Sequence, residues 1–259
     1  MVTYKQQTLP LALSISWALS AAACASAPAT PAAPSSTPSD ESPAISASLS
    51  DASEETPPPV VRGRAIEFEG ESFLLSDFED QTLGHTLGGK WMDSFDSHQL
   101  GTTLDPHPLK VGDGGAQDSE HSLGIRGHFG RNVEPWPYAD VRAAFEPTDL
   151  SPFSSVRFWV KGNNKKYVLA LVRDAVADYS HYRAEFVATS EWTQIELTLD
   201  SFEQPNWGKA IEKNWQDVTA LSFQPSPTLS DEAYEIVVDN IELVRAPTAN
   251  EAEEASSPE

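Results

Sequence analysis

The amino-acid sequence predicts one all-β domain, folded as a sandwich or a barrel, and three observations lead to this prediction. Segments that alternate apolar and polar residues recur at short spacing between residues 62 and 247. Clusters of Gly, Pro, Asp and Asn separate these segments, and the apolar residues show almost no helical periodicity. Many short strands joined by turns are typical of sandwiches and barrels. A stretch of about 185 residues also suits a single domain.

Eleven segments carry the strand pattern, and turn residues lie between them. One short helical turn is expected as well, at Asp149–Pro152. The strands are expected at Ser72–Phe78, Gly89–Asp93, Gln99–Leu104, Ser122–His128, Tyr138–Phe145, Ser155–Lys161, Tyr167–Arg173, His181–Val187, Thr193–Leu199, Thr219–Gln224 and Glu235–Val244.

Residues 178–208 hold the clearest alternation and the best candidate for a ligand site. Two strands here each turn apolar residues to one face and polar residues to the other. The more polar side carries His, Arg, Tyr and Trp together, and Trp207 follows in a Pro-Asn-Trp-Gly turn. We therefore expect a ligand to bind in this region. The alternating sets are Tyr182, Ala184 and Phe186 against His181, Arg183 and Glu185, then Thr193, Ile195, Leu197 and Leu199 against Trp192, Gln194, Glu196 and Thr198.

Two other strands have informative faces. Tyr167–Arg173 is apolar on both faces, which predicts a central strand that ends at Arg173 beside the expected site. In Glu235–Val244, Asp239 shares a face with the apolar residues Val237, Ile241 and Leu243. A carboxylate in such a row is costly unless it is paired or binds a metal.

The N-terminal residues predict export. Residues 1–23 hold Lys5, an apolar run from Leu9 to Leu19 and a small-residue stretch, which is the layout of a secretory signal peptide. The only cysteine, Cys24, follows directly and excludes an intramolecular disulfide. Its position resembles the lipobox of bacterial lipoproteins, although Ala21 stands where Leu is usual. The resemblance implies diacylation of Cys24 and a lipid-anchored protein of the bacterial cell envelope, at the outer membrane. Cleavage before Ala25 and a buried Cys24 are the alternatives.

Two segments outside the domain have the composition of disordered chain. Residues 24–61 are rich in Ala, Pro, Ser and Thr, and residues 248–259 are acidic, so neither buries enough apolar surface to offset its ordering entropy. They hold nine acidic residues and no basic ones. The domain itself keeps thirty acidic residues against sixteen basic ones, a net charge of −14. This balance excludes nucleic acid as a partner, because phosphate binding needs a basic surface.

Five sequence pieces, taken in order, resemble the galactose-binding-like jelly rolls over residues 72–244. The most similar families are the family-11 carbohydrate-binding modules and the domain of the complex I intermediate-associated protein of thirty kilodaltons. Residues 84–130 match this pattern poorly and lack a G-G-x-S signature. The pieces are L-L-S-D-F-E-D at Leu74–Asp80, R-F-W-V-K-G-N at Arg157–Asn163, Y-R-A-E-F with E-W-T-Q-I-E-L within Tyr182–Leu197, D-S-F-E-Q-P-N-W-G at Asp200–Gly208 and V-D-N-I-E-L at Val238–Leu243.

This resemblance implies a jelly-roll sandwich of two antiparallel sheets, one of them concave, with no catalytic machinery. It also implies a structural Ca²⁺ at the positions of Glu79, Asp239 and Asp80. Calcium takes six to eight oxygen ligands, some of them backbone carbonyls that a sequence does not reveal. The alternative is a solvated Glu79, with Asp239 paired to an arginine or to backbone amides.

The candidate ligand residues follow from the chemistry of sugar binding. Aromatic rings stack on sugar faces, and polar side chains fix the hydroxyl groups. Tyr182 alternates with the apolar set and is also a candidate for the core, and His181 is alternatively an exposed strand residue. The sequence places a polysaccharide or oligosaccharide against Arg173, Tyr179, His181, Tyr182, Arg183, Trp207 and Trp136.

The sequence gives no support to an enzyme. The six histidines lie on separate segments, and there is no G-x-S-x-G, P-loop or dinucleotide fingerprint. Pairs of carboxylates arise by chance in an acidic chain, so they do not indicate a glycosidase. Two functions remain: a surface-anchored protein that binds polysaccharide without cleaving it, and an assembly module of the intermediate-associated type that binds a protein partner and no sugar.

Overall fold

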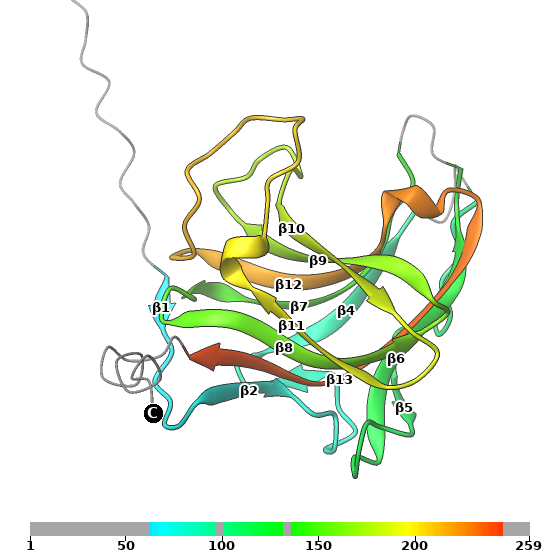
Figure 1. Cartoon of the computed structure of the whole chain (residues 1–259), viewed down its shortest axis with the longest axis horizontal. Helices are drawn as coiled ribbons and strands as arrows, with labels where there is room; N and C mark the ends of the chain where they lie inside the picture. The colour runs from blue at the N-terminus through cyan, green and yellow to red at the C-terminus, as the bar shows by residue number, and fades with distance from the viewer. Residues whose placement is uncertain (1–62, 97–100, 132–135, 246–259) are drawn as a thin grey trace, which may run out of the picture. The chain divides into compact units, whose positions relative to one another are not determined.

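The computed structural model describes residues 63–96, 101–131 and 136–245, and it confirms a two-sheet jelly-roll sandwich (Figure 1). All strand pairs are antiparallel except that between β1 and β7, which is parallel. Sheet A has the order β10 (Tyr182–Ala188), β9 (Lys165–Arg173), β12 (Val218–Pro225), β7 (Ala139–Asp149), β4 (Gly89–Phe95) and β3 (Gly84–His85), with β1 (Arg64–Ala65) beside β7. Sheet B has the order β11 (Thr193–Thr198), β8 (Phe153–Gly162), β13 (Glu232–Arg245), β6 (His121–Phe129) and β5 (Val111–Asp113), with β2 (Ser72–Ser76) beside β13.

The predicted strands correspond to observed ones with two corrections. The predicted strand at Gln99–Leu104 is not observed, because residues 101–104 form no strand. Asp105 makes only an isolated bridge to Arg126. Positions 97–100 lie outside the described residues. The expected helical turn at 149–152 is also wrong, because β7 continues to Asp149 and a plain turn follows. The short strands β1, β3 and β5 have too few residues to show an alternating pattern.

The inner faces of the two sheets meet in an aromatic core. The ring of Phe158 on β8 lies 5.0 Å from that of Phe223 on β12 and 5.2 Å from that of Phe186 on β10, both edge to face. Trp91 stacks on Phe223, and its indole Nε1 donates a 2.8 Å hydrogen bond to Ser76 of the opposite sheet. Edge-to-face pairs add to the free energy gained from burial alone. These rings therefore hold sheet A and sheet B together.

Alternation along the strands leaves each sheet an outer face. On β7, Val141 and Ala143 join the core, so Asp140, Arg142 and Ala144 point outward. The two 3-10 helices, Leu199–Ser201 and Pro227–Leu229, lie in connections between strands. Within the described ranges no helix is both long and apolar enough to cross a membrane. The expected signal peptide at 1–23, Cys24, the tether at 24–61 and the tail at 248–259 all lie outside those ranges.

Candidate functional site

The outer face of sheet A has a floor of small side chains. Ala170 on β9 pairs with Ser222 on β12, and Ser222 pairs with Arg142 on β7, so these residues form one row across the sheet. Arg183 on β10 and Met92 on β4 extend the row at its two ends. The floor residues point away from the core and are still at most 3 % exposed, because longer neighbouring side chains stand above them. The floor consists of Val168, Ala170, Ala220 and Ser222.

Asp140 and Arg142 form the polar centre of this face. The Oδ2 atom of Asp140 accepts a 3.1 Å hydrogen bond from the Ser222 hydroxyl and lies 3.3 Å from the Arg142 guanidinium. Its Oδ1 atom is buried and has no partner among the described residues. Burial raises the pKa of Asp140 to about 6, and the nearby Arg142 opposes that rise. Asp140 thus fixes a half-exposed guanidinium, which is a donor for ligand oxygens.

His181 and Arg183 lie on the same face, as the alternating sequence predicts. His181 is half-buried, its Nδ1 has no partner among the described residues, and burial lowers its pKa, with a further contribution from the charge of Arg142. Its ring is therefore neutral near pH 7. Burial also lowers the pKa of Arg183, whose backbone N–H and C=O bond to Glu203. The face thus combines two guanidinium groups with a neutral imidazole.

Four exposed aromatic side chains stand at the two ends of this face. Tyr179 is 84 % exposed and Trp207 is 49 % exposed, in the loops that follow β9 and β11. Trp136 and Tyr138, 60 % and 51 % exposed, precede β7 and so lie at the opposite end of the strands. Tyr138 and Ala144 are six residues apart, which corresponds to about 20 Å along a strand. The face therefore suits an extended ligand better than a single small molecule.

The loops that carry Tyr179 and Trp207 are fastened to each other by Asp178. One carboxylate oxygen accepts hydrogen bonds from the Ser180 N–H and hydroxyl, and the other accepts from the Lys209 N–H. The Ser180 hydroxyl bond, followed by the bonds from Lys209 and Ser180 N–H groups, lowers the pKa of Asp178, which stays ionised. Tyr179 has a φ of 64°, a conformation that bulky residues rarely adopt. The loop contacts therefore hold an exposed ring in a strained backbone position.

Two of the predicted ligand residues belong to the core instead. Arg173 is 4 % exposed, and its guanidinium contacts Asp217, the Asn214 amide and the Glu212 carbonyl. Tyr182 is buried, and its hydroxyl donates to the Ile211 carbonyl. Both residues follow the inward alternation of their strands. The prediction that they contact a ligand is wrong. Both side chains instead contact residues 211–217 of the long loop after β11.

The sequence interpretation missed the residues that β7 and β12 contribute to this face. Asp140 and Arg142 alternate with Val141 and Ala143, a pattern that was available in the predicted strand at 138–145. Gln224 donates from Nε2 to the Ser222 hydroxyl and so extends the polar row. Nothing local in the sequence reveals that β12 lies between β7 and β9.

The residues expected to bind calcium come together only in part. The Oε1 atom of Glu79 accepts hydrogen bonds from the Ser119 hydroxyl and from the N–H groups of Glu120 and His121. Asp239 is fully buried, and its oxygens accept from the Ala116 and Asn240 N–H groups. Burial raises the pKa of Asp239, and the charge of Glu79 adds to that rise, so these two carboxylates lie near each other.

Asp80 is occupied elsewhere, since its carboxylate accepts from the N–H and hydroxyl of Thr82. Among the described residues no group of three His, Cys, Asp or Glu side chains could hold a metal ion. N–H and O–H groups donate hydrogen bonds to Oε1 of Glu79 and to both carboxylate oxygens of Asp239. These hydrogen bonds use oxygen lone pairs that a bound cation would need. This arrangement does not fit Ca²⁺, and calcium binding stays an untested prediction.

A comparison with family models matches residues 137–235 to the complex I intermediate-associated protein 30 family. The match begins just before β7 and ends within β13, so it spans Asp140, Arg142, His181, Arg183 and Trp207. It supports the resemblance drawn from the sequence.

The chain is also similar to a protein named as an endoglucanase. It is 26 % identical over 187 residues to Endoglucanase 3 of Fibrobacter succinogenes, covering 68 % of this chain and 28 % of that protein. It therefore spans about a quarter of the length of this relative.

Two solved structures show the same sandwich. One is the family 11 carbohydrate-binding module of a cellulosomal cellulase of Clostridium thermocellum, with a TM-score of 0.51 and 18 % identity over 69 % of this chain and 97 % of that one. The other is the family 11 module from the same organism in complex with a β-1,3-1,4-mixed-linked tetrasaccharide, with a TM-score of 0.51 and 17 % identity over 69 % and 98 % of the two chains. These similarities confirm the jelly-roll fold.

Proposed function

We propose that this protein binds a polysaccharide on the outer face of sheet A and does not cleave it. The observation that carries the proposal is the combination of a small-residue floor with exposed aromatic rings at both ends of the same face. Aromatic rings stack on the apolar faces of sugar rings. Because the floor residues are buried, a sugar chain between these rings would lie against the more exposed Arg142, His181 and Arg183.

The polar groups of this face match the hydroxyl groups of a sugar. Arg142 and Arg183 donate hydrogen bonds, while Asp140 accepts them, and the neutral ring of His181 can do either. A sugar hydroxyl is both a donor and an acceptor, so it needs both kinds of partner.

The similar proteins suggest which polysaccharide to test first. The family 11 module of Clostridium thermocellum was solved with a mixed-linked β-1,3-1,4 tetrasaccharide, and the Fibrobacter relative is named an endoglucanase. Soluble mixed-linked β-glucan is therefore the first probe, with xylan and a galactan as alternatives. Incubation with β-glucan should release no reducing ends, and any hydrolysis would contradict the non-catalytic proposal.

The decisive variant is Trp207→Ala, measured by affinity electrophoresis and calorimetry on the full chain. Because Trp207 is half-exposed in a loop, we expect at least a tenfold loss of affinity with an unchanged melting temperature. Trp215→Ala is the matched control, since Trp215 is buried against Phe202 and Tyr182 and its loss should cost about 3–5 kcal/mol of stability. Unaltered glycan affinity of Trp207→Ala would overturn the proposed site.

A protein partner in place of a sugar is the second candidate, and the match to the intermediate-associated family over residues 137–235 favours it. The same experiment separates the two. If no β-glucan, xylan or galactan binds and Trp207→Ala instead removes a protein from a pull-down, the assembly function replaces the sugar-binding one.

We further propose that Cys24 is diacylated and anchors the protein in the bacterial cell envelope, at the outer membrane. The support is the signal-like segment at 1–23 and the small residues before Cys24. Mass spectrometry of the mature N-terminus should find a lipidated Cys24, and Cys24→Ser should release the protein from membranes. An unmodified N-terminus downstream of Cys24 would contradict the anchor.

A further inference from the structure

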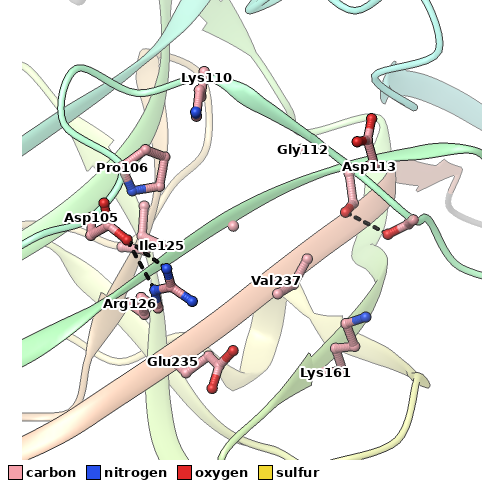
Figure 2. Close-up of a pocket in the computed structure, with 13 residues that line it drawn as sticks. Asp105, Pro106, Lys110, Gly112, Asp113, Ile125, Arg126, Lys161, Glu235 and Val237 are labelled. Atoms are coloured by element: carbon pink, nitrogen blue, oxygen red, sulfur yellow. Dashed lines mark hydrogen bonds and ion pairs between the residues drawn. The ribbon is translucent and has the colours of Figure 1, made fainter.

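Sheet B carries an open hollow on its own outer face, on the opposite side of the sandwich from the proposed polysaccharide site. The hollow has a volume of about 430 Å³ and lies over β5, β6, β13 and β8 (Figure 2). A second hollow of about 490 Å³ adjoins it, because both are lined by Asp105, Arg126 and Glu235. Together they form a groove across the sheet, which we call the sheet B groove.

The floor of the sheet B groove is nearly free of side chains. Gly124 on β6 pairs with Val237 on β13, and Val237 pairs with Lys161 on β8. A Cβ atom on Gly124 would lie 3.1 Å from a methyl group of Val237, so a larger residue would fill the floor. No aromatic residue lines the first hollow, and Tyr234, which lines the second, is buried. Ring stacking, which the opposite face provides, is therefore not the way in which this groove would hold a ligand.

Charged side chains surround the first hollow instead. In Figure 2, Lys110, Asp113, Lys161 and Glu235 lie around it, and Arg126 is joined to Asp105 at one side. The guanidinium of Arg126 is neutralised by Asp105 at 2.9 Å.

Lys110 and Lys161 differ from Arg126 because neither ammonium group is paired with a carboxylate of a described residue. Neither Lys110 nor Lys161 has a carboxylate within ion-pair distance in the described part of the chain, and Lys161 instead lies over the ring of Trp192 at 4.7 Å. Glu235 likewise forms no ion pair with any described residue. The domain has thirty acidic residues against sixteen lysines and arginines, yet these two ammonium groups have no carboxylate partner among the described residues, so an anionic group can approach them.

We propose that the sheet B groove is a second glycan site that binds a negatively charged sugar unit. Its carboxylate or sulfate group would contact Lys110 and Lys161, and its ring would lie over Gly124 and Val237. Its hydroxyl groups would donate to Glu235. A lysine ammonium binds an anionic group more strongly than a neutral hydroxyl, which is why an acidic sugar fits this groove better than a neutral glucan.

The test measures binding of the full chain to polygalacturonate, which carries carboxylates, to carrageenan, which carries sulfates, and to neutral mixed-linked β-glucan. A chelator in the buffer prevents calcium from bridging the polymer to the acidic protein. We expect at least one anionic polymer to bind and the Lys110→Gln/Lys161→Gln variant to lose about tenfold in affinity. Binding should weaken steeply at about 0.5 M salt, because the contact is between charges. The polymer that binds tells whether a carboxylate or a sulfate is recognised.

Three controls make the result specific. Lys110→Arg/Lys161→Arg keeps both charges and should retain binding, while Lys209→Glu changes an exposed lysine on the sheet A side and should have no effect. Trp207→Ala should leave the anionic polymer bound and remove only the neutral glucan, so the two sites can fail separately. A melting curve of each variant shows that it is folded. The proposal is overturned if neither anionic polymer binds, or if binding survives the double Gln substitution or is lost with Trp207→Ala.

Discussion

Asp140 is a buried carboxylate on the outer face of sheet A, and burial raises its pKa to about 6. In the unfolded chain an aspartic acid has a pKa of about 3.9. Between these two values the folded protein binds the Asp140 proton more tightly than the unfolded chain does. The contribution of Asp140 to stability is therefore full below pH 4 and is lost as the pH rises through 6.

We predict that Asp140→Asn removes a pH dependence of about 3 kcal/mol, which corresponds to the shift of about two pKa units. The free energy of unfolding of the wild type relative to the variant should fall from pH 4 to pH 7. Urea denaturation at a series of pH values measures it. Comparing the two proteins cancels the groups whose pKa is lowered, such as His181 and Asp178. Parallel curves for the two proteins would contradict the burial of this charge.

The loops after β9 and β11 depend on a contact between Asp178 and Gly208. Gly208 has a φ of 83°, and a Cβ atom there would lie 2.6 Å from the Asp178 carboxylate and 2.7 Å from the Ser180 hydroxyl. The carboxylate reaches the Lys209 N–H only because this position has no side chain. One glycine thus lets two loops far apart in the sequence present Tyr179 and Trp207 together.

We predict that Gly208→Ala separates these loops and lowers glycan affinity about as much as Trp207→Ala does. The substitution combines an unfavourable backbone conformation with a steric clash. Gly70→Ala is the matched control, since Gly70 has a φ of 94° but nothing within 4 Å of its Cβ position. It should bind glycan as the wild type does. Equal affinities for the two variants in calorimetry would show that the clash has no functional role.

At the scale of the whole molecule, one loop supplies hydrogen-bond donors to two of the carboxylates that the resemblance assigns to a cation. Glu79 and Asp239 receive hydrogen bonds from residues 116–121, which connect β5 and β6. These bonds tie the segment after β2, the loop and β13 together.

We therefore predict that the melting temperature is the same in excess calcium and in chelator. Differential scanning calorimetry of the full chain measures it. Ser119→Ala, which removes one of the donors to Glu79, should lower the melting temperature equally in both buffers. A rise in the melting temperature with calcium alone would mean that the carboxylates rearrange around the ion, as the family resemblance implies.

The sequence by itself determined the strands, the sandwich and much of one edge of the site. Period-two alternation is a local property of the backbone, so it assigned His181 and Arg183 to the outer face before any contact was known. The same alternation grouped Tyr182 with the apolar set, and the prediction of a ligand role for Tyr182 set aside that signal. Arg173 ends a strand that is apolar on both faces, so alternation did not decide which face it occupies. Trp207 and Trp136 were found as aromatic residues in turns.

Only the tertiary structure decided which strands are neighbours. Backbone hydrogen bonds pair any two strands equally well, and the register is set by how the inner faces pack over long sequence separations. This packing places Arg142 of β7 in one row with Ser222 of β12 and Ala170 of β9. It also gives the buried Arg173 a partly exposed partner, Asp217, from 44 residues away. The polar centre of the site is therefore a product of strand order, which no local pattern contains.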